Sequence, residues 1–198
     1  QNFHRKDFKI HRIKNQEHGS LIEYIKKAKF YPNFQARYCT RMFKIEPIDD
    51  FLEQYKTEGV ELMIGLNADE IEQRTGNHGN KKFVKYSYPL ADNNLTRGHC
   101  IVILKKVGLY PEFPSYMKRG GCIGCYYKSK KEYEAMALLN PSEFNIVQEL
   151  EEEIQDKRDK FFSILQNKPM RQIKSDVSNL LFAPDEIYPV INNSTNCG

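Results

Sequence analysis

Residues 60–66 read Val-Glu-Leu-Met-Ile-Gly-Leu, a compact apolar run directly after Gly59, and they decide the fold class. An apolar run of this length, bounded by glycine, is typical of a strand buried in a parallel sheet. A second strand is predicted over residues 82–89, and helices are expected over residues 20–28, 96–107 and 129–139. Strands that alternate with helices favour an α/β fold with a mainly parallel sheet.

Local signals set the expected boundaries of the other elements. Pro47 is predicted to begin a helix, Gly108 to end one, and Ser129 with Glu132 to form a capping box. Residues 8–13 have strand character. A longer helix is predicted over residues 143–165, with the charge run 149–153 on a solvated face. We therefore expect an α/β domain over residues 1–140, which includes the cysteines discussed below, and a helical extension over residues 141–198.

The composition is that of a soluble globular protein. Hydrophobic residues make up 40% and charged residues 28% of the 198 positions, which argues against disorder. The net charge of +4 suits an anionic nucleotide but is too small to indicate DNA binding by itself. No apolar run is long enough to span a membrane, and residues 1–6 do not resemble a secretory signal. A cytoplasmic protein is expected.

Two of the five cysteines, Cys122 and Cys125, stand in the stretch Gly-Gly-Cys-Ile-Gly-Cys at residues 120–125. A C-x-x-C turn lets both thiolates face one metal ion or cluster. The alternatives are a redox-active dithiol and a pair of incidental thiols. The odd number of cysteines and a reducing compartment favour metal binding over disulfides.

Cys39 and Cys100 are less easily interpreted from their surroundings. Cys39 lies just before a predicted helix. Cys100 lies in the first turns of another, beside Ile101 and Val102, where a lone cysteine is usually a small core residue. Local geometry alone does not make Cys100 a ligand.

Charged residues follow the strand at residues 60–66. In open α/β sheets ligands bind at the carboxyl ends of strands, so Asp69, Glu70 and Arg74 are candidates for a site. The guanidinium of Arg74 suits phosphate or sulfate, and Arg37 and Lys44, which flank Cys39, would add positive charge. Alternatively, Asp69 caps a following turn and Arg74 pairs with a neighbouring carboxylate.

Several short motifs occur in a fixed order along residues 20–157. They are Arg37-x-Cys39-Thr40 with Lys44, Ile45, Pro47 and Ile48; Ile64-Gly65-Leu66-x-Ala68-Asp69-Glu70 with Arg74; Tyr88-Pro89-Leu90; Thr96-Arg97-x-x-Cys100; and Gly121-Cys122-Ile123-Gly124-Cys125 with Ser129 and Glu132. In this order they resemble the phosphoadenosine phosphosulfate (PAPS) reductase-like family of the adenine nucleotide α-hydrolase (N-type ATP pyrophosphatase) superfamily.

The resemblance implies a Rossmann-like α/β fold that binds ATP, another adenine nucleotide or a sulfonucleotide at the strand ends. It implies an oxidoreductase or sulfur transferase, acting in sulfonucleotide reduction, sulfur transfer or ATP-dependent nucleotide modification. Similar members with four cysteines hold a [4Fe–4S] cluster, whose usual ligands are four thiolates, and zinc would accept the same set. The metal ligands implied are Cys39, Cys100, Cys122 and Cys125; the catalytic residues are Asp69, Glu70 and Arg74; and the cofactor-binding residues are Arg37 and Lys44.

One family feature does not occur in this sequence. Family members carry a Ser-Gly-Gly-Lys-Asp-Ser-like phosphate loop after their first strand, and residues 1–198 contain none. We expect the α/β domain to be incomplete at its N-terminus, the loop to come from a second chain, or the loop to have been lost. In the last case the chain would be a non-enzymatic, metal-stabilised module for a protein or nucleic acid partner, served by Lys128, Lys130 and Lys131.

Further residues have expected roles around this site. Tyr126 and Tyr127 are expected to pack around the cluster and limit solvent access. His99 is expected on a helix surface or as a hydrogen-bond donor to a cluster sulfur, and His78 in a solvated loop. Cys197 resembles, by position only, the nucleophilic cysteine on the mobile tail of thiol-dependent reductases.

Overall fold

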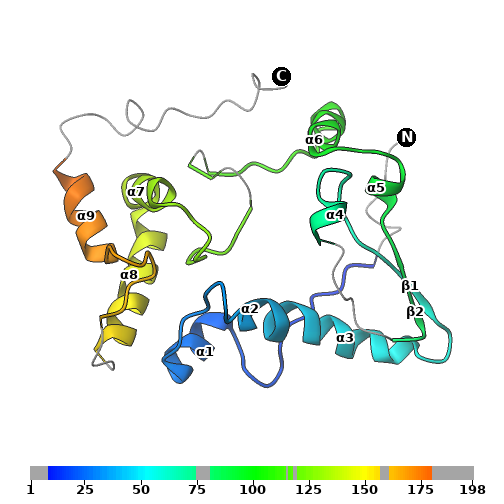
Figure 1. The fold of residues 1–198 in the computed structure, drawn as a ribbon, viewed down its shortest axis with the longest axis horizontal. Coiled ribbons are helices and arrows are strands. Elements are labelled where there is room, and N and C mark those ends of the chain that lie inside the picture. Colours follow the sequence, from blue (N-terminus) through cyan, green and yellow to red (C-terminus); the bar gives the residue numbers. More distant parts are fainter. Residues whose placement is uncertain (1–8, 75–80, 115, 118–119, 157–160, 180–198) are drawn as a thin grey trace. The chain divides into compact units, whose positions relative to one another are not determined.

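The computed structural model describes residues 9–74, 81–114, 116–117, 120–156 and 161–179. The chain divides into two compact units, and each is considered by itself. Unit 1 comprises residues 1–51 and 120–190, and unit 2 comprises residues 52–119 and 191–198. Most of the described elements are helices (Figure 1). Among them, none is long and apolar enough to cross a membrane.

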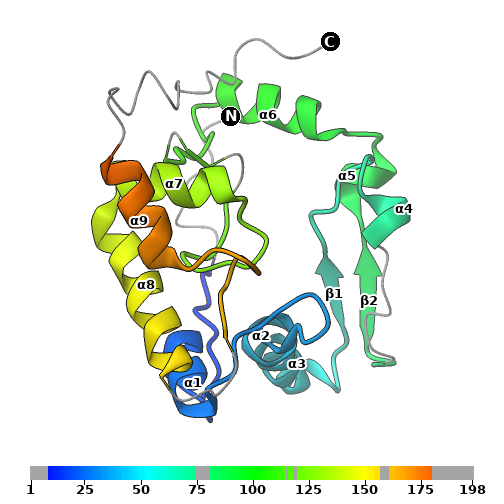
Figure 2. The same ribbon diagram turned by 60° about the vertical axis from the view of Figure 1, so that its left-hand side comes forward.

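Unit 1 is helical. Its elements are α1 (Leu21–Ala28), α2 (Tyr38–Thr40), a π-helical stretch (Arg41–Ile45), α3 (Glu46–Leu52, whose last residue belongs to unit 2), α7 (Lys130–Leu139), α8 (Pro141–Gln155) and α9 (Met170–Ser178). α7 packs against α8 and α9, and α1 packs against α8 (Figure 2). The largest fully buried side chains are Tyr133, Met136, Phe144, Val147, Ile154, Met170 and Ile173. The core of unit 1 is therefore built on the three helices that follow the C-x-x-C pair in sequence.

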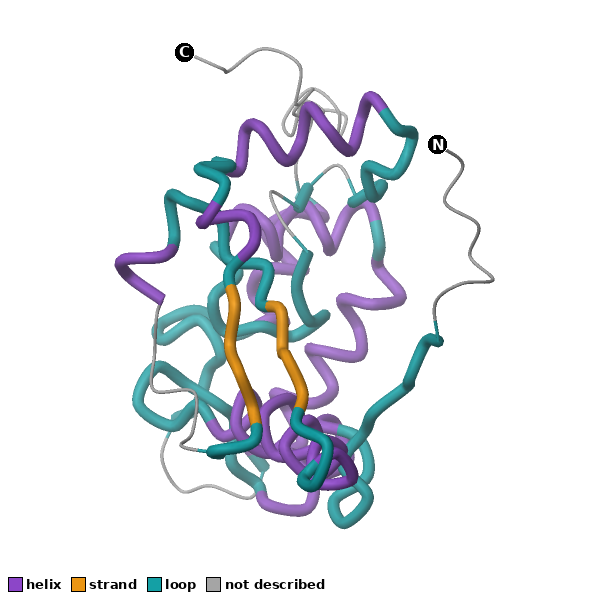
Figure 3. Tube along the Cα trace, turned by 90° about the vertical axis from the view of Figure 1, so that its right-hand side faces the viewer, coloured by secondary structure: helices purple, strands orange, loops and turns teal. Residues whose placement is uncertain are grey.

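Unit 2 contains the sheet. Its strands β1 (Val60–Met63) and β2 (Val84–Ser87) run parallel, with Val60 opposite Val84 (Figure 3). Its helices are a 3₁₀ turn (Glu53–Tyr55), α4 (Ile71–Arg74), α5 (Pro89–Asp92) and α6 (Arg97–Lys106). The parallel pairing of the two predicted strands is confirmed. Over the described residues the sheet has only these two strands, so the expected Rossmann-like sheet is wrong in extent, and the fold is mostly helical.

Three predicted helix starts are confirmed, and each carries a capping box. The backbone N–H of Glu23 donates to the Ser20 hydroxyl (3.2 Å), and the Glu23 carboxylate accepts the Ser20 N–H (2.7 Å). The same reciprocal bonds occur at α6 and α7, whose N-caps are Thr96 and Ser129. These starts were predictable because a capping box involves only residues three positions apart.

Other predicted boundaries are wrong. Residues 9–13, the described part of the strand predicted over 8–13, have no regular structure. Pro47 does not begin a helix, because helical backbone already runs from Tyr38, through a π-helical stretch in which the Glu46 N–H donates to the Arg41 carbonyl. α8 ends at Gln155 rather than at residue 165. α7 and α8, on either side of residue 140, pack together within unit 1.

Candidate functional site

The C-x-x-C pair forms a tight hydrogen-bonded turn in unit 1. The Cys125 N–H donates to the Cys122 carbonyl (3.3 Å), and the Lys128 N–H donates to the Cys125 carbonyl (2.9 Å). Both thiols are free, that of Cys122 on an exposed residue and that of Cys125 on a half-buried one. A turn closed in this way holds the two cysteines near each other at the surface, as a chelating pair requires.

Two buried tyrosines bind the inner side of this turn. The Tyr31 hydroxyl donates to the Gly124 carbonyl, and the Tyr133 hydroxyl donates to the Cys125 carbonyl (3.0 Å). Their side chains are 4% and 0% exposed. Burial raises the pKa of both phenols, and the nearby charges of Cys125 and Glu151 raise it further, so both hydroxyls stay protonated and remain donors.

Gly124 is the point of closest approach between the turn and the core. A Cβ added there would overlap the Tyr31 hydroxyl and meet Val147 Cγ2 at 3.6 Å. A Cβ on Gly121 would meet nothing within 4 Å. Of these two glycines, Gly124 is therefore the one required by packing.

The segment that contains Cys39 contacts the residues after Cys125 through aromatic rings. The Phe34 ring packs edge-on against the rings of Tyr126 and Tyr127, at centroid distances of 5.1 and 4.8 Å. The Arg37 guanidinium lies 5.7 Å from the centroid of Tyr127. Burial raises the pKa of Tyr126 to about 12, with contributions from Tyr127 and from the nearby Cys39 thiol. The segment around Cys39 and the residues after Cys125 are thus packed together.

Cys39 lies in α2, two residues before the π-helical stretch Arg41–Ile45. Short π-helical stretches inside helices are frequent at functional sites. Lys44, near the end of that stretch, is exposed. Arg37 is exposed too and serves as the N-cap residue of α2.

Cys100 lies in unit 2, in the first turn of α6, where it is half-buried and its N–H donates to the Thr96 carbonyl (3.0 Å). The other three predicted ligands, Cys39, Cys122 and Cys125, belong to unit 1. Among the described residues, no group of three or more His, Cys, Asp or Glu side chains is arranged to hold a metal ion. Two of the four predicted ligands therefore share the C-x-x-C turn. Cys39 belongs to a segment packed against that turn, and Cys100 belongs to unit 2.

The predicted catalytic residues of unit 2 have partners within their own unit. Arg74 forms an ion pair with Glu70 (2.9 Å), as the simpler alternative predicted. The Asp69 carboxylate accepts the Arg97 N–H (2.8 Å) at the start of α6. It therefore caps that helix, whereas the alternative placed the cap on the turn after Asp69. The charged candidates therefore fall into two groups. Arg37 and Lys44 belong to unit 1, and the three candidates after β1 belong to unit 2.

His99 and two lysines of the predicted basic cluster have local contacts. The His99 ring accepts the Thr96 N–H (3.3 Å) as part of the α6 capping box. The Lys128 side chain is only 7% exposed, and Lys130 pairs with Glu134 (3.1 Å), so the predicted basic cluster is not one exposed surface. His78 and Cys197 lie outside the described residues.

Sequence reasoning missed a buried carboxylate in unit 1. Glu151 was expected on a solvated face, but it is 3% exposed and accepts the backbone N–H groups of Ile164 (2.8 Å) and Met170 (2.5 Å). Burial raises its pKa, while these two hydrogen bonds oppose the rise. The apolar spacing of Val147, Leu150 and Ile154 on α8 was the available signal, because position 151 shares their face.

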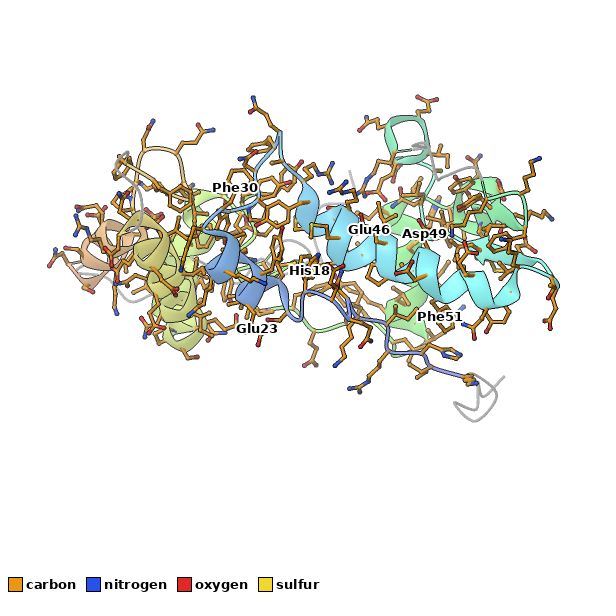
Figure 4. The ribbon with its side chains drawn as sticks, turned by 90° about the horizontal axis from the view of Figure 1, so that it is seen from below. His18, Glu23, Phe30, Glu46, Asp49 and Phe51 are labelled. Atoms are coloured by element: carbon orange, nitrogen blue, oxygen red, sulfur yellow. The ribbon has the colours of Figure 1, made fainter. Side chains whose placement is uncertain are left out.

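Sequence reasoning also missed a groove in unit 1. It has a volume of about 420 Å³ and lies between residues 11–17 and α3, where Figure 4 labels Glu46 and Phe51. The His11 ring packs against Phe51 at 4.7 Å. No cysteine lines this groove, so it is distinct from the C-x-x-C turn.

No family model, curated protein or solved structure matches the chain.

Proposed function

We propose that this chain holds an iron–sulfur cluster and acts in sulfur chemistry on a nucleotide. Cys39, Cys122 and Cys125 are the proposed thiolate ligands of unit 1, and Cys100 is the proposed ligand of unit 2. The observation that carries the proposal is the hydrogen-bonded C-x-x-C turn, which has free thiols at the surface and buried tyrosines behind it. Thiolate donors suit iron–sulfur clusters and zinc.

The nucleotide part of the proposal rests on the motif order and on the parallel strand pair. The carboxyl ends of parallel strands are where α/β proteins bind nucleotides, and both Asp69 and the start of α6 follow those ends in unit 2. Under this proposal the family's Rossmann-like sheet is represented here by β1 and β2. A second chain would supply the loop that holds the phosphates of the adenine nucleotide or sulfonucleotide, because residues 1–198 contain no such loop.

Metal analysis of anaerobically purified protein tests the proposal. We expect about four iron and four sulfide per chain, with thiolate-to-iron charge-transfer absorption in the visible range. Zinc without sulfide would overturn the cluster while supporting the thiolate site. Neither iron nor zinc, even after anaerobic reconstitution with iron and sulfide, would overturn both.

One observation favours a second candidate, a metal-stabilised module that binds single-stranded nucleic acid. Phe34 and Tyr127 are 58% and 42% exposed, and Arg37 lies over the Tyr127 ring. Exposed aromatic rings beside arginine are typical surfaces for stacking bases.

Binding of a fluorescently labelled single-stranded oligonucleotide, followed by anisotropy, tests this second candidate. Phe34→Ala and Tyr127→Ala should each weaken binding about fivefold or more. Phe161→Ala is the matched control, because Phe161 is also exposed in unit 1 but is not part of this aromatic group. Equal affinities in all four proteins, or no binding by the parent, would remove the candidate.

A further inference from the structure

The C-x-x-C turn in unit 1 has its backbone fixed from the side opposite to solvent. Two successive carbonyls, those of Gly124 and Cys125, each accept a hydrogen bond from a buried tyrosine hydroxyl. Tyr31 follows α1 and Tyr133 belongs to α7, so residues about 100 positions apart converge on one four-residue turn. The turn is already closed by its own backbone hydrogen bonds, so it does not need the two tyrosines in order to form.

Both hydroxyls lie on side chains that are buried in the core of unit 1. The Tyr31 ring packs against Phe162 at 6.0 Å, and the Tyr133 side chain is fully buried. A buried hydroxyl without a partner is strongly unfavourable, so both hydroxyls are committed to the turn carbonyls. Gly124 completes the fit, because any side chain there would displace the Tyr31 hydroxyl.

We propose that Tyr31 and Tyr133 are positioning residues for the metal site: they hold the Cys122–Cys125 turn in its ligand-binding shape before metal arrives. This inference rests on the proposed function and adds two residues that never contact the metal. Fixing the carbonyls of residues 124 and 125 restricts the backbone that carries both sulfurs. Less conformational entropy is then lost when a metal binds both thiolates.

The expected consequence is a loss of metal affinity when either hydroxyl is removed. Groups that orient metal ligands without touching the metal typically change affinity by 10–100-fold. Tyr31→Phe and Tyr133→Phe each keep the buried ring and remove one hydrogen bond. We expect each variant to bind Co²⁺ about tenfold more weakly than the parent chain, and the double variant to bind more weakly still.

Co²⁺ titration of the full-length reduced apo chain, followed by thiolate charge-transfer absorption, measures this affinity. Tyr24→Phe is one control, since Tyr24 lies in the same unit and its ring packs against Tyr38 and Phe43. Glu151→Gln is the second control, because it removes a buried carboxylate that binds Ile164 and Met170 and leaves the turn itself intact. Both controls should retain the parent affinity, with folding verified by circular dichroism.

Two results would overturn the inference. Parental Co²⁺ affinity in both Tyr→Phe variants is the first. An equal loss of affinity in Glu151→Gln is the second, since it would show that general stability of unit 1 sets the affinity.

A measurement without metal distinguishes failure of the metal site from failure of the positioning role of the tyrosines. If the parent chain binds no Co²⁺, the iron and sulfide analysis decides the proposed function, and amide hydrogen exchange in the apo protein decides the role of the tyrosines. Exchange of the Cys125 amide should be about tenfold faster in Tyr133→Phe than in the parent. Unchanged exchange would overturn the positioning role independently of any metal.

Discussion

The carboxylate of Glu151 on α8 accepts the backbone N–H of Met170, the first residue of α9, at 2.5 Å. The same carboxylate accepts the N–H of Ile164 at 2.8 Å. One buried side chain therefore satisfies two amides of the segment that leads into α9, including one that the first turn of a helix leaves without an intrahelical partner. This places a buried carboxylate of α8 against the segment that leads into α9.

We expect Glu151→Ala to destabilise the protein by about 3 kcal/mol, because hydrogen bonds to a charged group contribute roughly 1.5–3 kcal/mol each and the amides would be left buried. Urea unfolding of the full chain, followed by circular dichroism, measures this loss. Glu149→Ala, at an exposed position on the same helix, should change stability by no more than about 0.5 kcal/mol. Similar stabilities for the two variants would contradict the structural role of Glu151.

The ion pair between α1 and α8 predicts a pH dependence. Hydrogen bonds from Lys29 and then Lys26 lower the pKa of Glu153 to about 2 from an ordinary value of 4.5. A carboxyl whose pKa is lowered in the folded state stabilises the protein above pH 4.5, and this contribution is lost as the pH falls toward 2. Glu153→Gln should therefore lower the melting temperature at pH 7. Melting curves at pH 7, 4, 3 and 2 should show the difference from the parent shrinking to nothing, and a constant difference would rule out the linkage.

The two glycines around the cysteines should respond differently to the same substitution. Gly124→Ala forces a methyl group against the Tyr31 hydroxyl, whereas Gly121→Ala has open space. Overpacking of this kind typically destabilises by about 1–3 kcal/mol. Thermal melts and Co²⁺ titrations of both variants provide the comparison. We expect losses in Gly124→Ala alone, and equal effects would show that the close approach of Tyr31 is unimportant.

Asp69 is predicted to contribute to the stability of unit 2. Because its carboxylate accepts the Arg97 N–H at the start of α6, Asp69→Ala should lower stability by about 1 kcal/mol, as loss of a helix cap does. Arg74→Met, which breaks only an exposed i,i+4 pair, should change stability by about 0.5 kcal/mol or less. Urea unfolding distinguishes the two variants, and a neutral Asp69→Ala would argue against the cap.

Much of the local structure could be predicted because its causes are local. Ser20, Thr96 and Ser129 begin helices through partners three residues away. Gly108, at a φ of +67°, ends α6 as a glycine in the left-handed region commonly does. The first strand was predictable because a short apolar run bounded by glycine favours a strand. Its burial was not, since half-buried and exposed residues alternate along β1 and Met63 is 67% exposed.

What could not be predicted depends on distant contacts. α8 stops at Gln155, and the Phe162 N–H then donates to the Gln155 side chain (2.5 Å) while Ile164 binds Glu151. Helical periodicity over residues 143–165 contains no sign of these bonds. Likewise, the approach of Tyr31 and Tyr133 to one turn depends on the packing of α1 on α8 and of α7 on α8 and α9. Neither tyrosine has a sequence neighbour that indicates this approach.

We propose that four of the five cysteines hold the metal. The iron and sulfide content of five single Cys→Ser variants, each reconstituted anaerobically in parallel with the parent chain, tests this proposal. We expect most of the bound iron and sulfide to be lost in Cys39→Ser, Cys100→Ser, Cys122→Ser and Cys125→Ser, and the parent content to be retained in Cys197→Ser. Retention of the parent iron and sulfide content in any of these four variants would contradict the four-cysteine site.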